Sequence, residues 1–292
     1  MTRSSASPPF TADLPTTVFW HQGLPPGNRS TSAGVQSLML EVRGLTKRFR
    51  GLTAVDHVDF VVRPGEIAGY LGPNGSGKST TVKMLAGLLH PTEGTILFEG
   101  REIRQDPIAF KQKLGYVPEE PNLYGYLTGL EYLQLAGRLR GMDETQVNRR
   151  ANELLELLSL REARWGLLST YSKGMKQRVL IAAALLHDPE FLIFDEAQSG
   201  LDIANSLLFR HLLHALAARG RTILYISHIL ELVEKVCSHV VVIYRGKIVA
   251  DDSVHRLREL MSLPNLEEIF TQLVHQDDME ARAREIAAVI QA

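Results

Sequence analysis

The 292 residues include 32 Lys plus Arg and 33 Asp plus Glu, and 45% of them are hydrophobic. This composition is typical of a globular protein with one large core or two unequal ones, and a formal net charge of -1 gives no electrostatic reason to expect nucleic acid as a main partner. The one cysteine, Cys237, excludes an internal disulfide and a thiolate metal cage, so we expect it to be a small apolar core residue.

Residues 1 to about 37 are rich in Ser, Thr, Pro and Gly and show no hydrophobic periodicity. Such a segment has too little apolar surface to offset the entropy of ordering it, so we predict a mobile N-terminal extension. The alternative is a natural start at Met39, within the first predicted strand. The sequence shows neither the apolar segment of a secretory signal nor the ~20 apolar residues that span a bilayer. We therefore expect a cytoplasmic chain that does not cross a membrane by itself.

Seven short runs are predicted as strands, and they are of two kinds. Three alternate partly between apolar and polar residues, as in a sheet with one exposed face: 38–42, 57–62 and 94–98. Four are almost continuously apolar, as strands of a parallel sheet covered on both faces must be: 67–71, 191–194, 222–227 and 240–244. We therefore predict an α/β fold with a mostly parallel core sheet and an antiparallel β layer.

Between about 119 and 188 the leucines follow helical spacing and no strand-like run occurs, which predicts an inserted helical subdomain. Two short amphipathic segments follow Asp251, the first with Leu257 and Met261, the second with Leu266 and Ile269. An Ala-rich stretch then leads to residue 292. These patterns divide the chain into the extension 1–37, a domain over 38–256 and a helical tail over 257–292.

A glycine-rich loop follows the predicted strand 67–71 and precedes a helical pattern, which is the context that a phosphate-binding loop (P-loop) requires. Its backbone N–H groups and the positive end of the helix would face the phosphates of ATP. Lys78 would reach the β- and γ-phosphates, and the Ser79 hydroxyl would bind Mg²⁺. The predicted ATP-binding residues are Gly72, Pro73, Asn74, Gly75, Ser76, Gly77, Lys78, Ser79 and Thr80.

Two carboxylates, Asp195 and Glu196, end the apolar strand that begins at Phe191. Ligands bind at the carboxyl ends of strands in open α/β sheets, and two adjacent acids there need a cation. Asp195 would hold Mg²⁺, and Glu196 would accept a proton from the water that attacks the γ-phosphate. A P-loop and an acidic strand end establish nucleotide chemistry but are shared by many classes of protein.

The segment Tyr171-Ser172-Lys173-Gly174-Met175-Lys176-Gln177-Arg178 resembles the signature motif of ABC ATPases. Ser172 is a good N-cap for the helix that follows, and the free N–H groups of that helix could receive an anion. The resemblance runs from about residue 38 to 274. It implies the P-loop NTPase fold of the ABC ATPase type, with Ser172, Lys173, Gly174 and Met175 closing on the ATP of a partner subunit.

Three further residues acquire roles from this resemblance. Phe49 stands where the family places an aromatic ring that stacks on adenine, with a core phenylalanine as the alternative. Asp202, in Ser199-Gly200-Leu201-Asp202, stands in the D-loop, which meets the partner subunit. His228, after the strand 222–227, resembles the histidine that contacts the γ-phosphate.

The chain departs from the family pattern at three places. Glu119 replaces the usual Q-loop glutamine, and its carboxylate can still ligate Mg²⁺, which is reminiscent of ABC-2-type export ATPases. The signature reads Tyr-Ser-Lys-Gly-Met in place of Leu-Ser-Gly-Gly-Gln. Ala197-Gln198 replaces the usual Pro-Thr after Glu196, which predicts a looser backbone at the catalytic glutamate.

The resemblance implies an ATP- and Mg²⁺-dependent ATPase that works as a homodimer or as a heterodimer with a paralogue. It would drive a separate polytopic membrane subunit, an exporter, from the inner face of the cell membrane. Two alternatives stay open: a non-transport ABC ATPase, and a weakly hydrolysing module that dimerises on ATP and regulates another protein.

Overall fold

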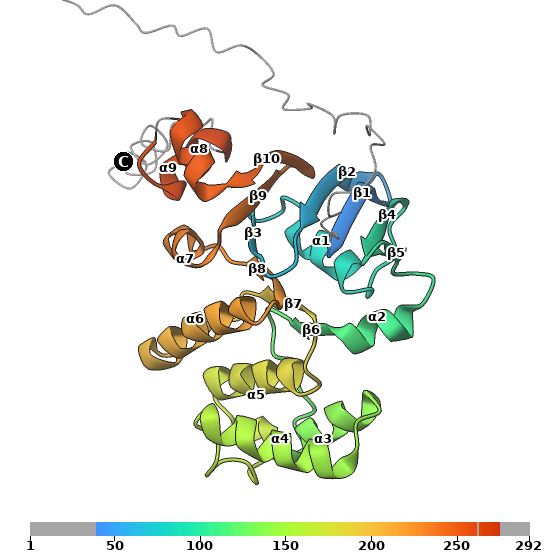
Figure 1. Cartoon of the computed structure of the whole chain (residues 1–292), viewed down its shortest axis with the longest axis vertical. Helices are drawn as coiled ribbons and strands as arrows, with labels where there is room; N and C mark the ends of the chain where they lie inside the picture. Colours follow the sequence, from blue (N-terminus) through green and yellow to red (C-terminus); the bar gives the residue numbers. More distant parts are fainter. Residues whose placement is uncertain (1–38, 262, 275–292) are drawn as a thin grey trace, which may run out of the picture. The chain divides into compact units, whose positions relative to one another are not determined.

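The computed structural model describes residues 39–261 and 263–274 (Figure 1). The predicted extension 1–37 and the Ala-rich end of the chain lie outside these residues, so the domain boundaries stay predictions. The strands are β1 Leu40–Phe49, β2 Leu52–Val62, β3 Ile67–Leu71, β4 Glu93–Phe98, β5 Arg101–Glu102, β6 Leu114–Val117, β7 Phe191–Asp195, β8 Thr222–Ile226, β9 His239–Tyr244 and β10 Lys247–Ser253. The α-helices are α1 Lys78–Leu85, α2 Pro107–Lys113, α3 Gly129–Leu139, α4 Glu144–Leu157, α5 Lys173–Leu185, α6 Ile203–Ala218, α7 Leu230–Val236, α8 Val254–Met261 and α9 Leu266–Val274, and a 3₁₀ turn, η1, covers Leu168–Thr170.

The predicted antiparallel layer is a four-stranded sheet in the order β2-β1-β4-β5. β1 pairs with β2 on one side and with β4 on the other, so that Leu40 lies opposite both Val62 and Phe98. The three alternating runs are therefore confirmed, although β1 continues to Phe49 through several register shifts. These irregularities break the period-two pattern that sequence reading relies on, which is why the prediction ended early.

The core sheet has the order β10-β9-β3-β8-β7-β6, and all of its neighbouring strands are parallel except β9 and β10. The four apolar runs are β3, β7, β8 and β9, and nearly all of their residues are buried. The sequence analysis missed two strands of this sheet, β6 and β10, and the two-residue strand β5 of the antiparallel sheet. β6 has only four residues, and β10 is an edge strand whose acidic residues interrupt the pattern.

The inserted helical subdomain is confirmed: residues 119–188, all of them described, contain α3, α4, η1 and α5, with one isolated bridge between Thr128 and Leu167. Each of the three helices begins at a side-chain cap. Thr128 and Glu131 form a capping box at α3, Asp143 caps α4, and Ser172 caps α5. Figure 1 shows the subdomain at the lower end of the view, with α5 next to the core sheet.

The two amphipathic segments of the tail form α8 and α9, and Leu257, Leu266 and Ile269 are buried in the same hydrophobic cluster as the core strands. Cys237 is buried as predicted, and this burial raises the pKa of its thiol. Among the described helices, none combines the length and the apolar composition needed to cross a bilayer.

Candidate active site

Four neighbouring parallel strands deliver the predicted site residues to one edge of the core sheet. In the order of the sheet, β3 leads to Lys78, β8 to His228, β7 to Asp195 and Glu196, and β6 to Glu119. Because these strands are parallel, their carboxyl ends meet at the same edge, where ligands bind in open α/β sheets. Strand order therefore gathers residues that lie up to about 150 positions apart in the sequence.

The backbone conformation of the P-loop leaves space for an anion at the start of α1. Gly77 is the N-cap of α1 with φ +110°, and no side chain caps this helix. A Cβ on Gly77 would lie 2.5 Å from the Ala54 carbonyl oxygen, so this position requires glycine. The first N–H groups of α1, including those of Ser79 and Thr80, therefore lie at an uncapped helix N-terminus, which is an anion site.

Lys78 points into the loop that precedes it. Its Nζ donates hydrogen bonds to the carbonyl oxygens of Gly72 at 2.6 Å and Pro73 at 3.0 Å. Burial lowers the pKa of Lys78, while the negative charges of Glu196, Asp195 and Glu119 oppose this shift. The ammonium group thus lies near three carboxylates and donates to two carbonyl groups. A bound phosphate would replace these carbonyl groups as the acceptor of the ammonium's hydrogen bonds.

The carboxylates form an acidic cluster at the ends of β6 and β7. Burial, followed by the repulsion of Glu119 and Glu196, raises the pKa of Asp195 to about 6. Asp195 is 6% exposed, so its charge is poorly solvated until a cation or Lys78 compensates it. No group of three or more His, Cys, Asp or Glu side chains in the described part of the chain has the arrangement of a complete metal site. Mg²⁺ usually takes one or two carboxylates and completes its shell with phosphates and water, so Asp195 and Glu119 are donors of the kind it takes.

Glu196 occupies a fixed and unusual backbone conformation. Its φ is +49°, its N–H donates to the Ile226 carbonyl at 3.0 Å, and its own carbonyl accepts from the Ser199 N–H at 2.9 Å. The Leu201 N–H donates to the Gln198 carbonyl at 3.1 Å. Ala197-Gln198 thus lies in a hydrogen-bonded turn, and the looser backbone expected from the loss of Pro-Thr stays a prediction.

His228 and Glu196 lie close enough to share a proton or a water. His228 Nδ1 is 2.9 Å from Glu196 Oε2, and the histidine is 72% exposed while the carboxylate is 12% exposed. The exposed imidazole thus lies beside a largely buried carboxylate, which can accept a proton from a water. The sequence analysis assigned these two residues to the site separately, and the structure brings them together.

Of the signature residues, Ser172 and Lys173 are exposed, and Gly174 and Met175 are half-buried. The Ser172 hydroxyl accepts a hydrogen bond from the Met175 N–H at 3.2 Å, which confirms the predicted cap of α5. Asp202 caps α6 by accepting from the Asn205 N–H at 2.8 Å. Within residues 39–261 and 263–274, no hydrogen bond or ion pair joins Ser172, Lys173, Gly174 or Met175 to the P-loop.

Phe49, at the end of β1, is 47% exposed, so the alternative of a core phenylalanine is wrong. The Lys47 ammonium lies 5.4 Å from the centre of its ring. An exposed ring at this edge of the antiparallel sheet is free to stack on a base.

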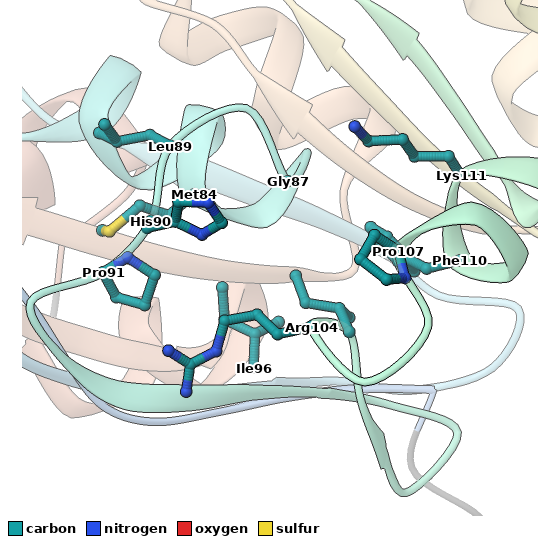
Figure 2. A pocket seen from close by; sticks show the side chains of 11 residues that line it. Met84, Gly87, Leu89, His90, Pro91, Ile96, Arg104, Pro107, Phe110 and Lys111 are labelled. Atoms are coloured by element: carbon teal, nitrogen blue, oxygen red, sulfur yellow. The ribbon is translucent and has the colours of Figure 1, made fainter.

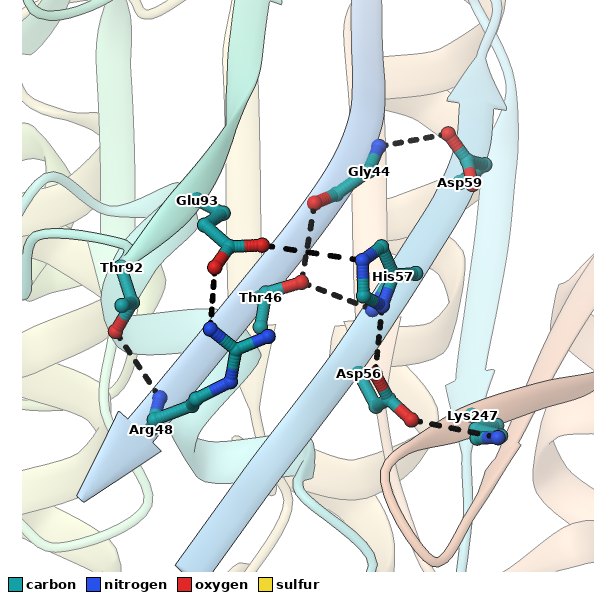
Figure 3. A network of polar contacts seen from close by, with 9 residues as sticks. All are labelled: Gly44, Thr46, Arg48, Asp56, His57, Asp59, Thr92, Glu93 and Lys247. Atoms are coloured by element: carbon teal, nitrogen blue, oxygen red, sulfur yellow. Dashed lines mark hydrogen bonds and ion pairs between the residues drawn. The ribbon is translucent and has the colours of Figure 1, made fainter. Parts of the chain in front are cut away.

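A polar network, missed by sequence analysis, joins the strands of the antiparallel sheet to Lys247 at the start of β10 (Figure 3). Asp56 contacts His57 Nδ1 at 2.6 Å and Lys247 Nζ at 3.3 Å. The Asp56 N–H donates to the Gly246 carbonyl, and the Gly246 N–H donates to the Ser76 carbonyl at 2.9 Å. The β9–β10 turn thus supports the P-loop, and a Gly after a buried strand was the only sequence signal for it.

A small cavity of about 40 Å³ lies apart from the P-loop, between the end of α1, β4 and α2 (Figure 2). This volume is on the order of one or two water molecules. Its walls are mostly apolar, with Met84, Ile96 and Phe110 inside and Arg104 and Lys111 at the rim. The cavity is too small for a nucleotide, so it does not compete with the P-loop as the candidate site.

Comparison with known proteins agrees with this geometry. The family model described as "ABC transporter" matches residues 55–199, which include the P-loop, the signature and the acidic strand end. The ABC transporter ATP-binding protein NatA of Bacillus subtilis (strain 168) is 35% identical over 237 residues, which cover 80% of this chain and 96% of NatA. The Nod factor export ATP-binding protein I of Cupriavidus metallidurans is 36% identical and is covered to 72% of its length by 75% of this chain.

A solved structure of an ATP-binding subunit of an ABC transporter superposes with a TM-score of 0.76 at 33% identity, covering 80% of this chain and 99% of the solved one. The predicted fold is therefore confirmed as that of an ABC ATPase cassette. The chain belongs to the ABC transporter family, as an ATP-binding and ATP-hydrolysing subunit.

Proposed function

We propose that two copies of this chain, or one copy and a paralogue, bind ATP between the P-loop of one subunit and the signature residues of the other. The main observation in support concerns the signature residues Ser172 and Gly174. Both reach the surface, and among the described residues neither makes a hydrogen bond or an ion pair with the P-loop. The start of α1, which no side chain caps, and the first turn of α5, where Ser172 caps the Met175 N–H, are two candidate anion sites. One ATP molecule would engage both by lying between two chains.

In this dimer, Glu196 acts as the general base for the attacking water, and His228 orients it and contacts the γ-phosphate. The 2.9 Å contact between the two side chains supports these two roles. Mg²⁺, when bound, neutralises developing charge on the phosphates. Ser79 and Asp195 would hold it, with Glu119 nearby, and the mutual repulsion that raises the pKa of Asp195 favours a cation there.

We also assign transport coupling to the helical subdomain. Its surface exposes large apolar side chains that a water-facing subdomain would not need: Tyr126 is 74% exposed, Trp165 65% and Tyr124 54%. The rings of Tyr124 and Tyr126 lie 5.8 Å apart, in the segment that joins Glu119 to α3. A cluster of this kind marks a protein interface. The partner is a polytopic membrane subunit, on which this chain docks at the inner face of the cell membrane. The resemblance to the Nod factor export protein favours export.

The shared ATP site can be tested by mixing two damaged subunits. Lys78→Ala removes the P-loop ammonium and leaves the signature intact, while Ser172→Ala removes the exposed signature hydroxyl and leaves the P-loop and the turn after Glu196 intact. Each variant alone is expected to hydrolyse ATP slowly, and an equimolar mixture is expected to regain turnover, because mixed dimers contain one intact site. No regain, although mixed dimers form, would contradict the proposal.

The coupling surface needs a separate experiment. Tyr126→Ser with Trp165→Ser is expected to keep the ATPase activity of the purified chain and to abolish its retention on vesicles containing the membrane subunit. Ile108→Ser is the matched control, because Ile108 is 74% exposed but lies on α2, outside the helical subdomain. Equal retention of all variants would favour a non-transport ATPase.

A further inference from the structure

Lys173 contacts the turn that follows Glu196. Its Nζ donates a hydrogen bond to Ser199 Oγ at 2.7 Å. Ser199 in turn donates its N–H to the Glu196 carbonyl at 2.9 Å, so two hydrogen bonds separate the lysine from the backbone of the general base. The usual family residue at this position is glycine, which cannot form the first of these bonds.

The same two segments also touch through their backbones. A Cβ on Gly174 would lie 2.3 Å from the Gly200 carbonyl oxygen, so the first turn of α5 packs directly on the turn. Gly200 has φ +81°, and a Cβ there would lie 3.1 Å from Cγ of Lys173. The aliphatic part of the lysine therefore runs along Gly200, and its ammonium reaches the neighbouring serine.

The first turns of α5 are also fixed to the helical subdomain. Arg178 donates from Nη1 to the carbonyl oxygens of Leu158 at 2.8 Å and Ser159 at 3.3 Å, just after the end of α4. α5 is thus attached to α4 by Arg178 and to the turn after Glu196 by Lys173. A displacement of the helical subdomain would reach the turn through these contacts.

We infer that Lys173 is a positioning residue that ties the turn after Glu196 to the signature helix, so that the catalytic carboxylate moves with the helical subdomain. The inference rests on the proposed function only in taking Glu196 as the general base. It makes the lysine part of the chain's own catalytic apparatus, whereas a contact with the partner's phosphates is the competing role.

Steady-state kinetics separate the two roles. Lys173→Met keeps the aliphatic stem, and Ser199→Ala removes the acceptor. Each is expected to lower kcat about three- to tenfold at unchanged KM, the effect of losing one hydrogen bond of ordinary strength at the surface. The double variant should be no slower than the Lys173→Met single, and Lys173→Arg should recover most of the rate. Lys235→Met, which removes an exposed lysine bonded to Glu231 on α7, is the matched control.

Hydrogen exchange of the nucleotide-free full-length chain tests the same contact without turnover. Lys173→Met and Ser199→Ala should both speed exchange at the amides of Ser199 and Leu201, and Lys235→Met should not. Three results would overturn the inference. They are unchanged amide exchange in Lys173→Met, a double variant whose loss of kcat equals the product of the two single losses, and a raised KM in Lys173→Met alone. If the wild type does not hydrolyse ATP, the proposed function fails, and the exchange data still decide on Lys173.

Discussion

The two halves of the proposed ATP site are built differently. The P-loop half is assembled inside one chain: Lys78 lies on loop carbonyls, Asp195 is buried, and Glu196 is held by backbone hydrogen bonds on both sides. In the signature half, Ser172 and Lys173 are exposed, Gly174 is half-buried against Gly200, and Lys173 donates a hydrogen bond to Ser199. This difference supports the proposal that a single chain can bind ATP but needs a second one to hydrolyse it.

The largest expected effect is on ATP binding through the P-loop half. Lys78→Ala removes a partly buried ammonium that faces three carboxylates, so the phosphates of ATP would meet uncompensated negative charge. We expect ATP affinity to fall about 100-fold or more, in line with the loss of a desolvated charged partner. Isothermal titration of the isolated chain measures it, with Lys83→Ala on the same helix as control. A change of less than about threefold would place the phosphates elsewhere.

Gly174→Ala is the counterpart in the signature half. The new Cβ would lie 2.3 Å from a backbone oxygen, so the start of α5 must shift. ATP affinity of the isolated chain should stay unchanged, while kcat falls about tenfold because closure on the partner is misaligned. Gly125→Ala is the control, since its Cβ would have its nearest neighbour at 3.4 Å. Loss of ATP binding in Gly174→Ala would contradict the separation of the two halves.

A smaller effect is expected from Glu119→Gln, at the border of the P-loop half. Glu119 is one of the charges that raise the pKa of Asp195, so it adds to the attraction of a cation. Its loss should raise the Mg²⁺ concentration for half-maximal activity about threefold. The exposed neighbour Glu120, changed to Gln, should have no effect. An equal Mg²⁺ requirement in all three proteins would remove Glu119 from the metal environment.

Sequence reading was most successful for strands of about five continuously apolar residues that are buried on both faces. The runs at 67–71 and 191–194 were placed almost to the residue, and with them the P-loop, Asp195 and Glu196. The contacts of Gly246 with the P-loop and of Lys173 with Ser199 could not be predicted, because they join segments whose approach depends on the packed fold. β6 was missed because four residues give too little pattern to distinguish a strand from a buried turn.

A change remote from both halves should affect stability and leave the site unchanged. His239 begins β9, at the sheet edge opposite the P-loop, with Nε2 2.5 Å from Asp251 and Nδ1 3.4 Å from Glu66. Burial lowers the pKa of His239, but the bonds to the two carboxylates outweigh it and raise the pKa to about 9.

Because this folded-state pKa exceeds the ordinary value of 6.5, the stabilisation is complete below pH 6.5 and is lost as the pH rises through 9. Urea unfolding should show a loss of at most about 3 kcal/mol across that window. His239→Gln should flatten the profile, and His255→Gln, an exposed histidine on α8, should not. Identical profiles in all three proteins would contradict the assignment.

The central claim, that Glu196 drives hydrolysis within an ATP-dependent dimer, is tested most directly by comparing the wild type with Glu196→Gln. Steady-state ATPase rates and size-exclusion chromatography in ATP and Mg²⁺ are measured for both. The wild type should turn over, and the variant should be at least ~100-fold slower and accumulate as a dimer, because binding is intact and the general base is lost. A wild type without turnover beside its membrane partner, or a variant that stays active, would contradict the account.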